Sequence, residues 1–125
     1  MKVAVLGGGA WGSVLANLAV RHGHDVALWE LDAAAASALA TQRTSARAVG
    51  GFRLADGVAV SSDLEASVGP ALAERGLIVV AIPVAAVRAT LARAARVASG
   101  GGAMARFWSP RARGSSRRRA PRWRT

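Results

Sequence analysis

The chain has 125 residues, of which 52% are hydrophobic, and it contains no cysteine. These values indicate one globular domain and exclude both a disulfide framework and a cysteine-ligated metal site. No apolar run is long enough for a membrane span or a signal peptide, so we expect a cytoplasmic protein. The net charge of +10 belongs mainly to the end of the chain, because the last twenty residues hold eight arginines and no carboxylate.

The first part of the chain alternates between strand and helix patterns. In chain order, the hydrophobic spacing predicts a strand at 2–6, a helix at 10–21, a strand at 25–29 and a helix at 33–41. Gly23 is a typical stop signal after the first helix, and Asp32 is expected to cap the second. Each strand is short and is followed by a helix, which is the pattern of a parallel sheet with crossover helices.

The alternation continues in the second part of the chain. A short strand at 58–60 is followed by a helix that Ser62 and Glu65 are expected to open as a capping box. Residues 77–82, LIVVAI, predict a strand covered on both faces. Pro83 suits the first turn of the next helix. The expected apolar stripe of that helix comprises Val84, Val87, Leu91 and Ala94.

Three glycines lie where the first strand is expected to turn into the first helix. Gly7, Gly9 and Gly12 fit the pattern G-x-G-x-x-G in the strand-to-helix context of a dinucleotide-binding turn. Gly7 allows the sharp turn, Gly9 lets a pyrophosphate approach the backbone, and Gly12 lets the helix pack closely on the strand. The free N–H groups of the helix N-terminus complete an anion site. The alternative is a glycine-rich turn that holds no ligand.

Glu30 ends the second predicted strand, twenty-three positions after the first glycine of the motif. An acidic side chain there accepts hydrogen bonds from both ribose hydroxyls of an adenosine and repels a 2′-phosphate, which favours NAD over NADP. The alternative is that Glu30, which is close to Asp32 in the sequence, is a solvated carboxylate in a turn. Trp11 also has two interpretations, shielding the pyrophosphate or packing against the sheet. His22 and His24 have no nearby carboxylate or cysteine ligands, so no metal site is expected.

These elements predict an α/β fold. We expect a Rossmann-like parallel sheet with flanking helices, incomplete and with about four strands, within residues 1–102. The periodicity stops after the serine and glycines at 99–102, and residues 103–125 are expected to form a disordered arginine-rich tail. In the strand order 3-2-1-4, the 77–82 strand occupies an apolar sheet edge that invites aggregation or a borrowed strand. We therefore expect a marginally stable chain.

Residues 3–29, VAVLGGGAWGSVLANLAVRHGHDVALW, resemble the opening of the NAD(P)-dependent glycerol-3-phosphate dehydrogenases. The family pattern is G-x-G-x-W-G, then a helix ending in N/H-G-H and a strand ending in L-W. The tryptophan inside the glycine motif makes the match more specific than a general Rossmann pattern. Residues 50–67 and 77–91 are similar to later segments of the same domain. The resemblance extends from residue 2 to about residue 102.

The resemblance implies both a site and a reaction. It implies that the pyrophosphate is bordered by Gly7, Gly9, Ala10, Trp11 and Gly12. It places Ile82 and Pro83 near the nicotinamide. Leu31 stands where the family often has Arg or His for a 2′-phosphate, which again favours NAD. The implied reaction is reversible hydride transfer between NAD(P)H and dihydroxyacetone phosphate, giving sn-glycerol 3-phosphate for phospholipid synthesis.

The chain departs from the family pattern at several positions. Ala48 and Gly50 replace an aromatic residue and a proline, and Val84 replaces a serine, so looser binding on the adenine side is expected. The family carries one lysine in S-K-G-I-E and a second in a helical substrate domain, but this chain has no lysine after Lys2. No catalytic residue is therefore assigned. We expect a cofactor-binding portion that is inactive by itself and meets the phosphorylated substrate only with the missing domain. The alternative is a dinucleotide-binding module without catalysis.

The tail has two interpretations. Residues 106–117, RFWSPRARGSSR, can be encoded by DNA whose shifted frame reads I-L-V-S-A-S-K-G-I-E-P, a fifth strand followed by the family's lysine motif. The first hypothesis is thus a frameshift near Gly102 to Arg106, which the coding DNA tests. The second is a functional arm, whose arginines and tryptophans Trp108 and Trp123 bind single-stranded nucleic acid by phosphate contact and stacking.

Overall fold

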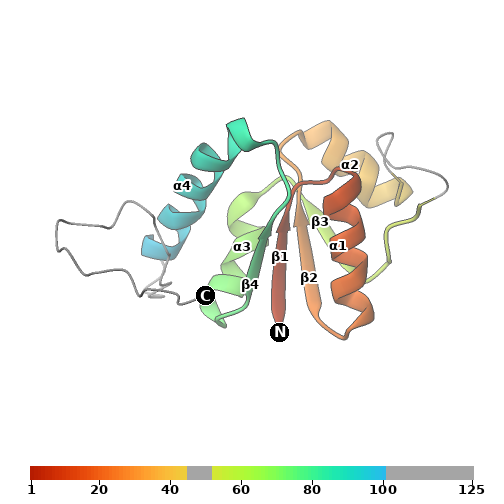
Figure 1. The fold of residues 1–125 in the computed structure, drawn as a ribbon, viewed down its shortest axis with the longest axis horizontal. Helices are drawn as coiled ribbons and strands as arrows, with labels where there is room; N and C mark the ends of the chain where they lie inside the picture. Colours follow the sequence, from red (N-terminus) through yellow and green to blue (C-terminus); the bar gives the residue numbers. More distant parts are fainter. Residues whose placement is uncertain (45–51, 101–125) are drawn as a thin grey trace, which may run out of the picture.

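A computed structural model of the chain describes residues 1–44 and 52–100. Strands and helices alternate along it (Figure 1). The elements are β1 (Lys2–Leu6), α1 (Ala10–Arg21), β2 (Asp25–Trp29), α2 (Ala33–Gln42), β3 (Val58–Ser61), α3 (Leu64–Ala73), β4 (Leu77–Val80) and α4 (Val84–Gly100). The expectations for Ala48, for Gly50 and for the tail at 103–125 lie outside the described residues.

The four strands form one parallel sheet in the order β3-β2-β1-β4. This order and the flanking helices confirm the predicted Rossmann-like α/β fold. In register, Leu6 at the end of β1 pairs with Trp29 of β2 on one side and with Val80 of β4 on the other. The carboxyl ends of these three strands therefore meet at one edge of the sheet, where ligands bind in open α/β sheets.

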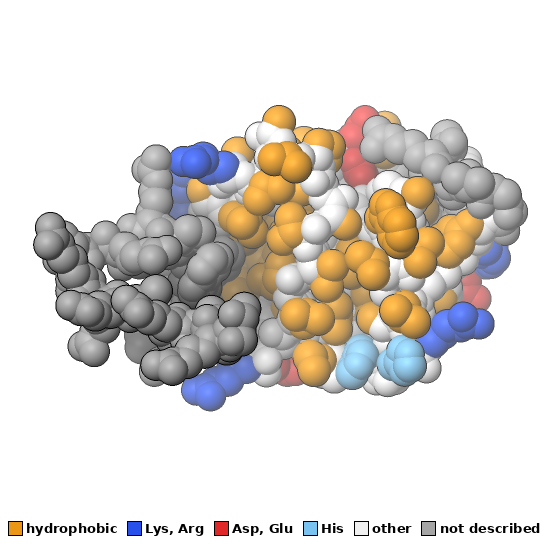
Figure 2. Space-filling model, in the orientation of Figure 1, with side chains coloured by type: hydrophobic (Ala, Val, Ile, Leu, Met, Phe, Trp, Pro, Cys, Tyr) orange, Lys and Arg blue, Asp and Glu red, His pale blue; other side chains and the backbone are white. Residues whose placement is uncertain are grey.

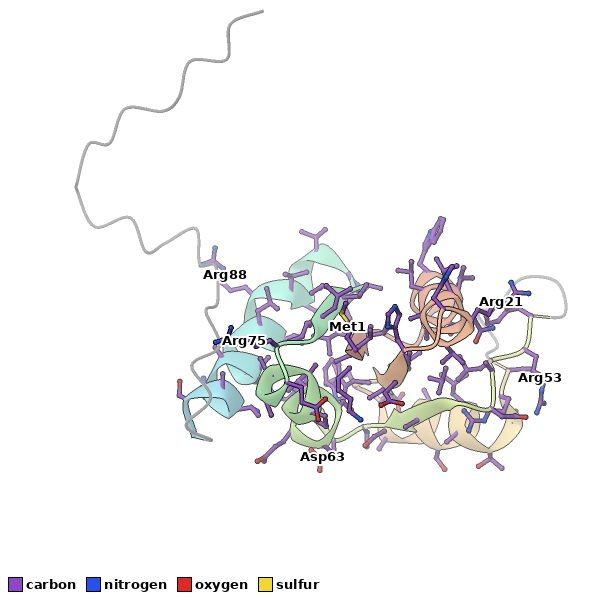
Figure 3. The ribbon with its side chains drawn as sticks, turned by 90° about the horizontal axis from the view of Figure 1, so that it is seen from below. Met1, Arg21, Arg53, Asp63, Arg75 and Arg88 are labelled. Carbon is purple, nitrogen blue, oxygen red and sulfur yellow. The ribbon has the colours of Figure 1, made fainter. Side chains whose placement is uncertain are left out.

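Two hydrophobic clusters cover the two faces of the sheet. On one face, β1 and β2 pack against α1 and α2; the buried members are Val3, Val5, Ala16, Val26, Leu28, Leu39, Leu54 and Val58. On the other face, the buried members are Ala4, Leu6, Trp29, Leu64, Val68, Ala71 and Ala94, with the helical ones from α3 and α4. Figure 3 shows α1 and α3 on opposite sides of the strands. Successive β1 residues enter opposite clusters because side chains alternate along a strand.

An aspartate caps the N-terminus of α2 and another caps that of α3, and only the cap of α2 is the one predicted. Asp32 accepts hydrogen bonds from the Ala34 and Ala35 N–H groups, as expected for the start of α2. The capping box at Ser62 is wrong, because α3 is capped one residue later by Asp63, which accepts from the N–H of Ala66 at 3.2 Å. Ser62 lies in the connection before α3, where its backbone carbonyl accepts from the Trp29 indole at 3.0 Å.

The final strand differs from the prediction in its extent and in the burial of its side chains. β4 ends at Val80, although the Ala81 N–H still donates to the Leu6 carbonyl at 2.8 Å. The prediction that both faces of this strand are covered is wrong, because Leu77 is 50% exposed and Val80 39% exposed. No described strand pairs with the outer edge of β4. This strand therefore forms the apolar edge that the strand order predicts.

The apolar stripe of α4 starts later than predicted. Val84 is 89% exposed, because the first turn of α4 extends past the carboxyl edge of the sheet (Figure 1). Ala94 is fully buried beside α3, and Thr90 is nearly so. Arg88 points away from the domain (Figure 3). The buried side of the helix is thus set by its contact with α3, while its first turn faces the carboxyl edge.

Asn17 of α1 ties the segment before β3 to the helix. Its side-chain amide donates to the Arg53 carbonyl at 2.9 Å, and its oxygen accepts from the Ala55 N–H at 2.7 Å. Between these two bonds, Leu54 is completely buried in the cluster under α1. A single side chain therefore satisfies both backbone groups that flank this buried leucine, on the side of the molecule where Figure 3 labels Arg53.

We expect Asn17→Ala to lower the free energy of unfolding by about 1–3 kcal/mol, because the part-buried Ala55 N–H loses its acceptor. Urea denaturation followed by circular dichroism measures the change. Asn17→Asp is the comparison, since it keeps the acceptor for the Ala55 N–H and replaces the donor to the Arg53 carbonyl by a carboxylate oxygen. Equal losses in both variants would contradict a dominant role for the Ala55 bond.

Candidate functional site

The turn between β1 and α1 brings two backbone segments into contact that leave no room for side chains. Gly7 has a φ of +123°, and a β-carbon there would collide with the Ala81 carbonyl after β4. A β-carbon at Gly12 would collide with the Gly7 carbonyl and lie 2.9 Å from its carbon. The geometry matches the sharp turn predicted at Gly7. It places the close packing predicted for Gly12 against the turn residue that follows β1 and not against the strand itself.

The backbone N–H groups of the turn divide into two sets. The Gly7 N–H donates to the Trp29 carbonyl at 2.8 Å, and the Gly8 N–H donates to Glu30 Oε2 at 2.9 Å. Among the described residues, the N–H groups of Gly9 to Gly12 have no acceptor, because helical bonding begins with Ser13 donating to the Gly9 carbonyl. The amides free to bind an anion are therefore the four at the α1 N-terminus.

Glu30 lies at the carboxyl end of β2 and faces the glycine turn. Its Oε2 accepts from the Gly8 N–H, and its Oε1 lies 3.4 Å from the Asp32 N–H. The side chain is half-buried, so Glu30 is not the freely solvated carboxylate of the alternative interpretation. Two backbone amides hold it at the edge where the strand ends meet.

A cavity of about 580 Å³ opens at this edge, a size typical of small-molecule sites. It is lined by eight of the nine residues predicted for cofactor binding: Gly7, Gly9, Ala10, Trp11, Glu30, Leu31, Ile82 and Pro83. Gly12 is the exception, since it is buried under the turn. Trp11 is 76% exposed at the rim, so its interpretation as a residue packed against the sheet is wrong.

The sequence analysis missed six other residues that line this cavity. They are Gly8, Trp29, Asp32, Ala81, Ala86 and Thr90. A signal for two of them was present, because Ala86 and Thr90 follow Pro83 at intervals of three and four and thus share its face of the helix. Gly8 gave no such signal, since its role depends on a contact with Glu30 across 22 positions.

The comparison with known protein families decides the family. Residues 2–105 match the model described as the N-terminus of NAD-dependent glycerol-3-phosphate dehydrogenase. The chain belongs to this family. It is accordingly an NAD(P)-binding domain of glycerol-3-phosphate dehydrogenase type, in agreement with the resemblance found in the sequence.

Individual members of the glycerol-3-phosphate dehydrogenase family support this assignment. The chain is 40% identical over 102 residues to a protein of Methylibium petroleiphilum, covering 82% of this chain and 30% of the relative. It is 44% identical over 97 residues to one of Burkholderia cenocepacia, covering 77% and 28%. Both relatives are called glycerol-3-phosphate dehydrogenase with NAD(P)+ in the name. The chain therefore spans less than a third of the length of these relatives.

A solved structure supports the fold. The crystal structure of glycerol-3-phosphate dehydrogenase from Coxiella burnetii superposes with a TM-score of 0.65 at 23% identity. The match covers 77% of this chain and 28% of that one. At this identity the likeness establishes the Rossmann-like architecture and nothing finer.

The cavity of this dehydrogenase domain fits a dinucleotide on its own geometry. A β-carbon at Gly9 would meet no atom within 4 Å, so the space in front of the free amides is open. The described cavity wall holds two carboxylates, Glu30 and Asp32, and neither lysine nor arginine.

Within residues 1–44 and 52–100, no helix is long and apolar enough to cross a membrane, and no three metal-ligating side chains cluster.

Proposed function

We propose that the chain binds NAD(H), with the pyrophosphate on the N–H groups of residues 9–12 and the adenosine ribose on Glu30. The observation that carries the proposal is that three of the four residues with free amides, Gly9, Ala10 and Trp11, line the same cavity as the Glu30 carboxylate. The amides supply hydrogen bonds and the positive end of the α1 dipole to an anion. The carboxylate, which lies beside the turn, supplies acceptors to the ribose hydroxyls.

The charge of the cavity favours NAD over NADP. A 2′-phosphate on the adenosine ribose would lie beside Glu30 and Asp32, two carboxylates that repel it. Leu31 lies between them, is 65% exposed and offers no positive charge. The described lining contains no cation to offset this repulsion.

The test is a titration of the ¹⁵N-labelled 125-residue chain with NADH, followed by amide resonances. We expect the resonances of Gly9, Ala10, Trp11 and Gly12 to move. The Gly23 resonance, which follows the opposite end of α1, is the internal control and should stay in place. Resonances of residues 9–12 that stay unmoved at millimolar NADH in a folded sample would contradict the proposal.

Removing the Glu30 charge should change the cofactor preference. We expect Glu30→Gln to raise the affinity for NADPH relative to NADH by about tenfold, because repulsion of the 2′-phosphate is lost. The ratio of dissociation constants from fluorescence titration measures this. Asp32→Asn is the matched control, since it removes an equal charge and leaves an amide able to cap α2. An equal change in both variants would refute specific ribose recognition by Glu30.

For a dehydrogenase that contains this domain, we propose hydride transfer between NAD(P)H and dihydroxyacetone phosphate. When bound, the nicotinamide supplies the hydride, and this chain supplies the wall that orients the cofactor. The chain carries no lysine after Lys2, so we expect cofactor binding without turnover. An assay of NADH oxidation with dihydroxyacetone phosphate tests this, and measurable turnover by the 125-residue chain would contradict it. A cytoplasmic location stays a prediction.

A further inference from the structure

Gly8 lies between the first two glycines of the motif, and its side of the turn faces Glu30. It is buried, and its N–H donates to Glu30 Oε2 at 2.9 Å. The glycine motif requires no glycine at this position, and the turn does not require one either, because the φ of Gly8 lies outside the positive range. Another contact must therefore explain the small residue here.

That contact is with the carboxylate. A β-carbon on Gly8 would lie 2.6 Å from Glu30 Oε2 and 3.3 Å from Glu30 Cβ. On a third side it would lie 3.4 Å from a methyl group of Leu39, which is buried and has little room to move. The end of the glutamate side chain is the most mobile of these neighbours. An added methyl group would therefore displace the carboxylate and leave the backbone in place.

We propose that Gly8 is a positioning residue that sets the cofactor specificity of this site through Glu30. Its N–H fixes one carboxylate oxygen, while the missing side chain leaves the volume that the carboxylate occupies. The other oxygen lies near the Asp32 N–H, so the group is oriented before any ribose arrives. This inference rests on the proposed function, since it concerns how the same cavity distinguishes NADH from NADPH.

The experiment compares Gly8→Ala with wild type in the 125-residue chain by titration with NADH and with NADPH. We expect Gly8→Ala to weaken NADH binding about tenfold and to change NADPH binding less, because the ribose loses its oriented acceptor. Gly9→Ala is the matched control: the same methyl group, one position along, meets no protein atom and should weaken both cofactors equally. The inference would be overturned if the ratio of the NADH to the NADPH dissociation constant were the same in Gly8→Ala as in wild type.

A double-mutant cycle shows whether the effect passes through the carboxylate. In a Glu30→Gln background, Gly8→Ala should change the ratio of the NADH to the NADPH dissociation constant less than it does in wild type. The reason is that the Glu30 charge, which the added methyl group displaces, is absent there. Full additivity would overturn the inference. Binding of NADH by the wild type is measured in the same series, so failure of the proposed function is distinguished from failure of the Gly8 role.

A second measurement tests the role of Gly8 without the Gly8→Ala variant, so it does not depend on whether that variant folds. The Gly8 amide resonance should move strongly between wild type and Glu30→Gln, because its acceptor changes from a carboxylate to an amide. The Gly9 amide, which has no protein acceptor in the described structure, should move less. A Gly8 resonance that is insensitive to this substitution would overturn the inference.

Discussion

Gly12→Ala is expected to lower the free energy of unfolding by about 3 kcal/mol or more and to abolish NADH binding. The new β-carbon would overlap the Gly7 carbonyl, which is backbone and cannot rotate away as a side chain can. Gly7 is itself held by its N–H bond to the Trp29 carbonyl, and the Ala81 carbonyl occupies the space where a β-carbon of residue 7 would lie. The helix must therefore separate from the turn, and the four free amides lose their common direction.

Chemical denaturation measures the stability change, and titration with NADH measures binding. Gly9→Ala is again the control, because it places the same methyl group in open space at a φ of −74° that alanine adopts readily. We expect Gly9→Ala to keep the wild-type stability to within about 0.5 kcal/mol while it weakens binding. Equal stability of Gly12→Ala and wild type would show that α1 does not depend on this close approach.

The second large effect concerns the open edge of β4. We expect the 125-residue chain to self-associate at micromolar concentration and to unfold below about 45 °C, because β4 presents an apolar strand edge. Leu77 and Val80 are exposed there, and Figure 2 shows hydrophobic side chains over much of the face between α4 and α1. Leu77→Lys should reduce association, since a charged residue on an edge strand disfavours pairing with another chain.

Sedimentation velocity at several concentrations measures the association. Leu18→Lys is the matched control, because Leu18 is also 50% exposed but lies on α1, away from any strand edge. We expect Leu18→Lys to leave the association unchanged. If Leu18→Lys reduced the self-association and Leu77→Lys did not, the contact between chains would lie on α1 instead, where Trp11 and Val14 are also exposed. A cooperative melt of the monomer at high temperature would contradict the predicted marginal stability.

The residues that the sequence placed correctly are those whose role is local. The glycine spacing and the strand before it predicted the turn, and Asp32 predicted the start of α2, because each depends on neighbours within a few positions. The capping box at Ser62 failed because two adjacent residues were able to cap α3, and Asp63 is the one that does so.

Burial was harder to predict, because it depends on which elements lie next to one another. The run LIVVAI has the composition of a central strand, yet β4 lies at an edge of the described sheet with Leu77 half exposed. Val84 has the spacing of a core residue, yet the first turn of α4 extends past the sheet and exposes it. Periodicity shows which residues share a face, whereas the tertiary structure shows whether anything covers that face.

The order of elements, the glycine turn and the acidic residue that faces it can be predicted from the sequence, since they follow from local conformation and spacing. Which amides remain free to bind an anion depends instead on the fold. Gly7 and Gly8 have ordinary backbone donors in the sequence, but the Trp29 carbonyl at the end of β2 and the side chain of Glu30, the next residue, accept from them. The physical reason is that a parallel sheet aligns strand ends that are distant in the chain, so these acceptors come from the end of another strand and the residue after it.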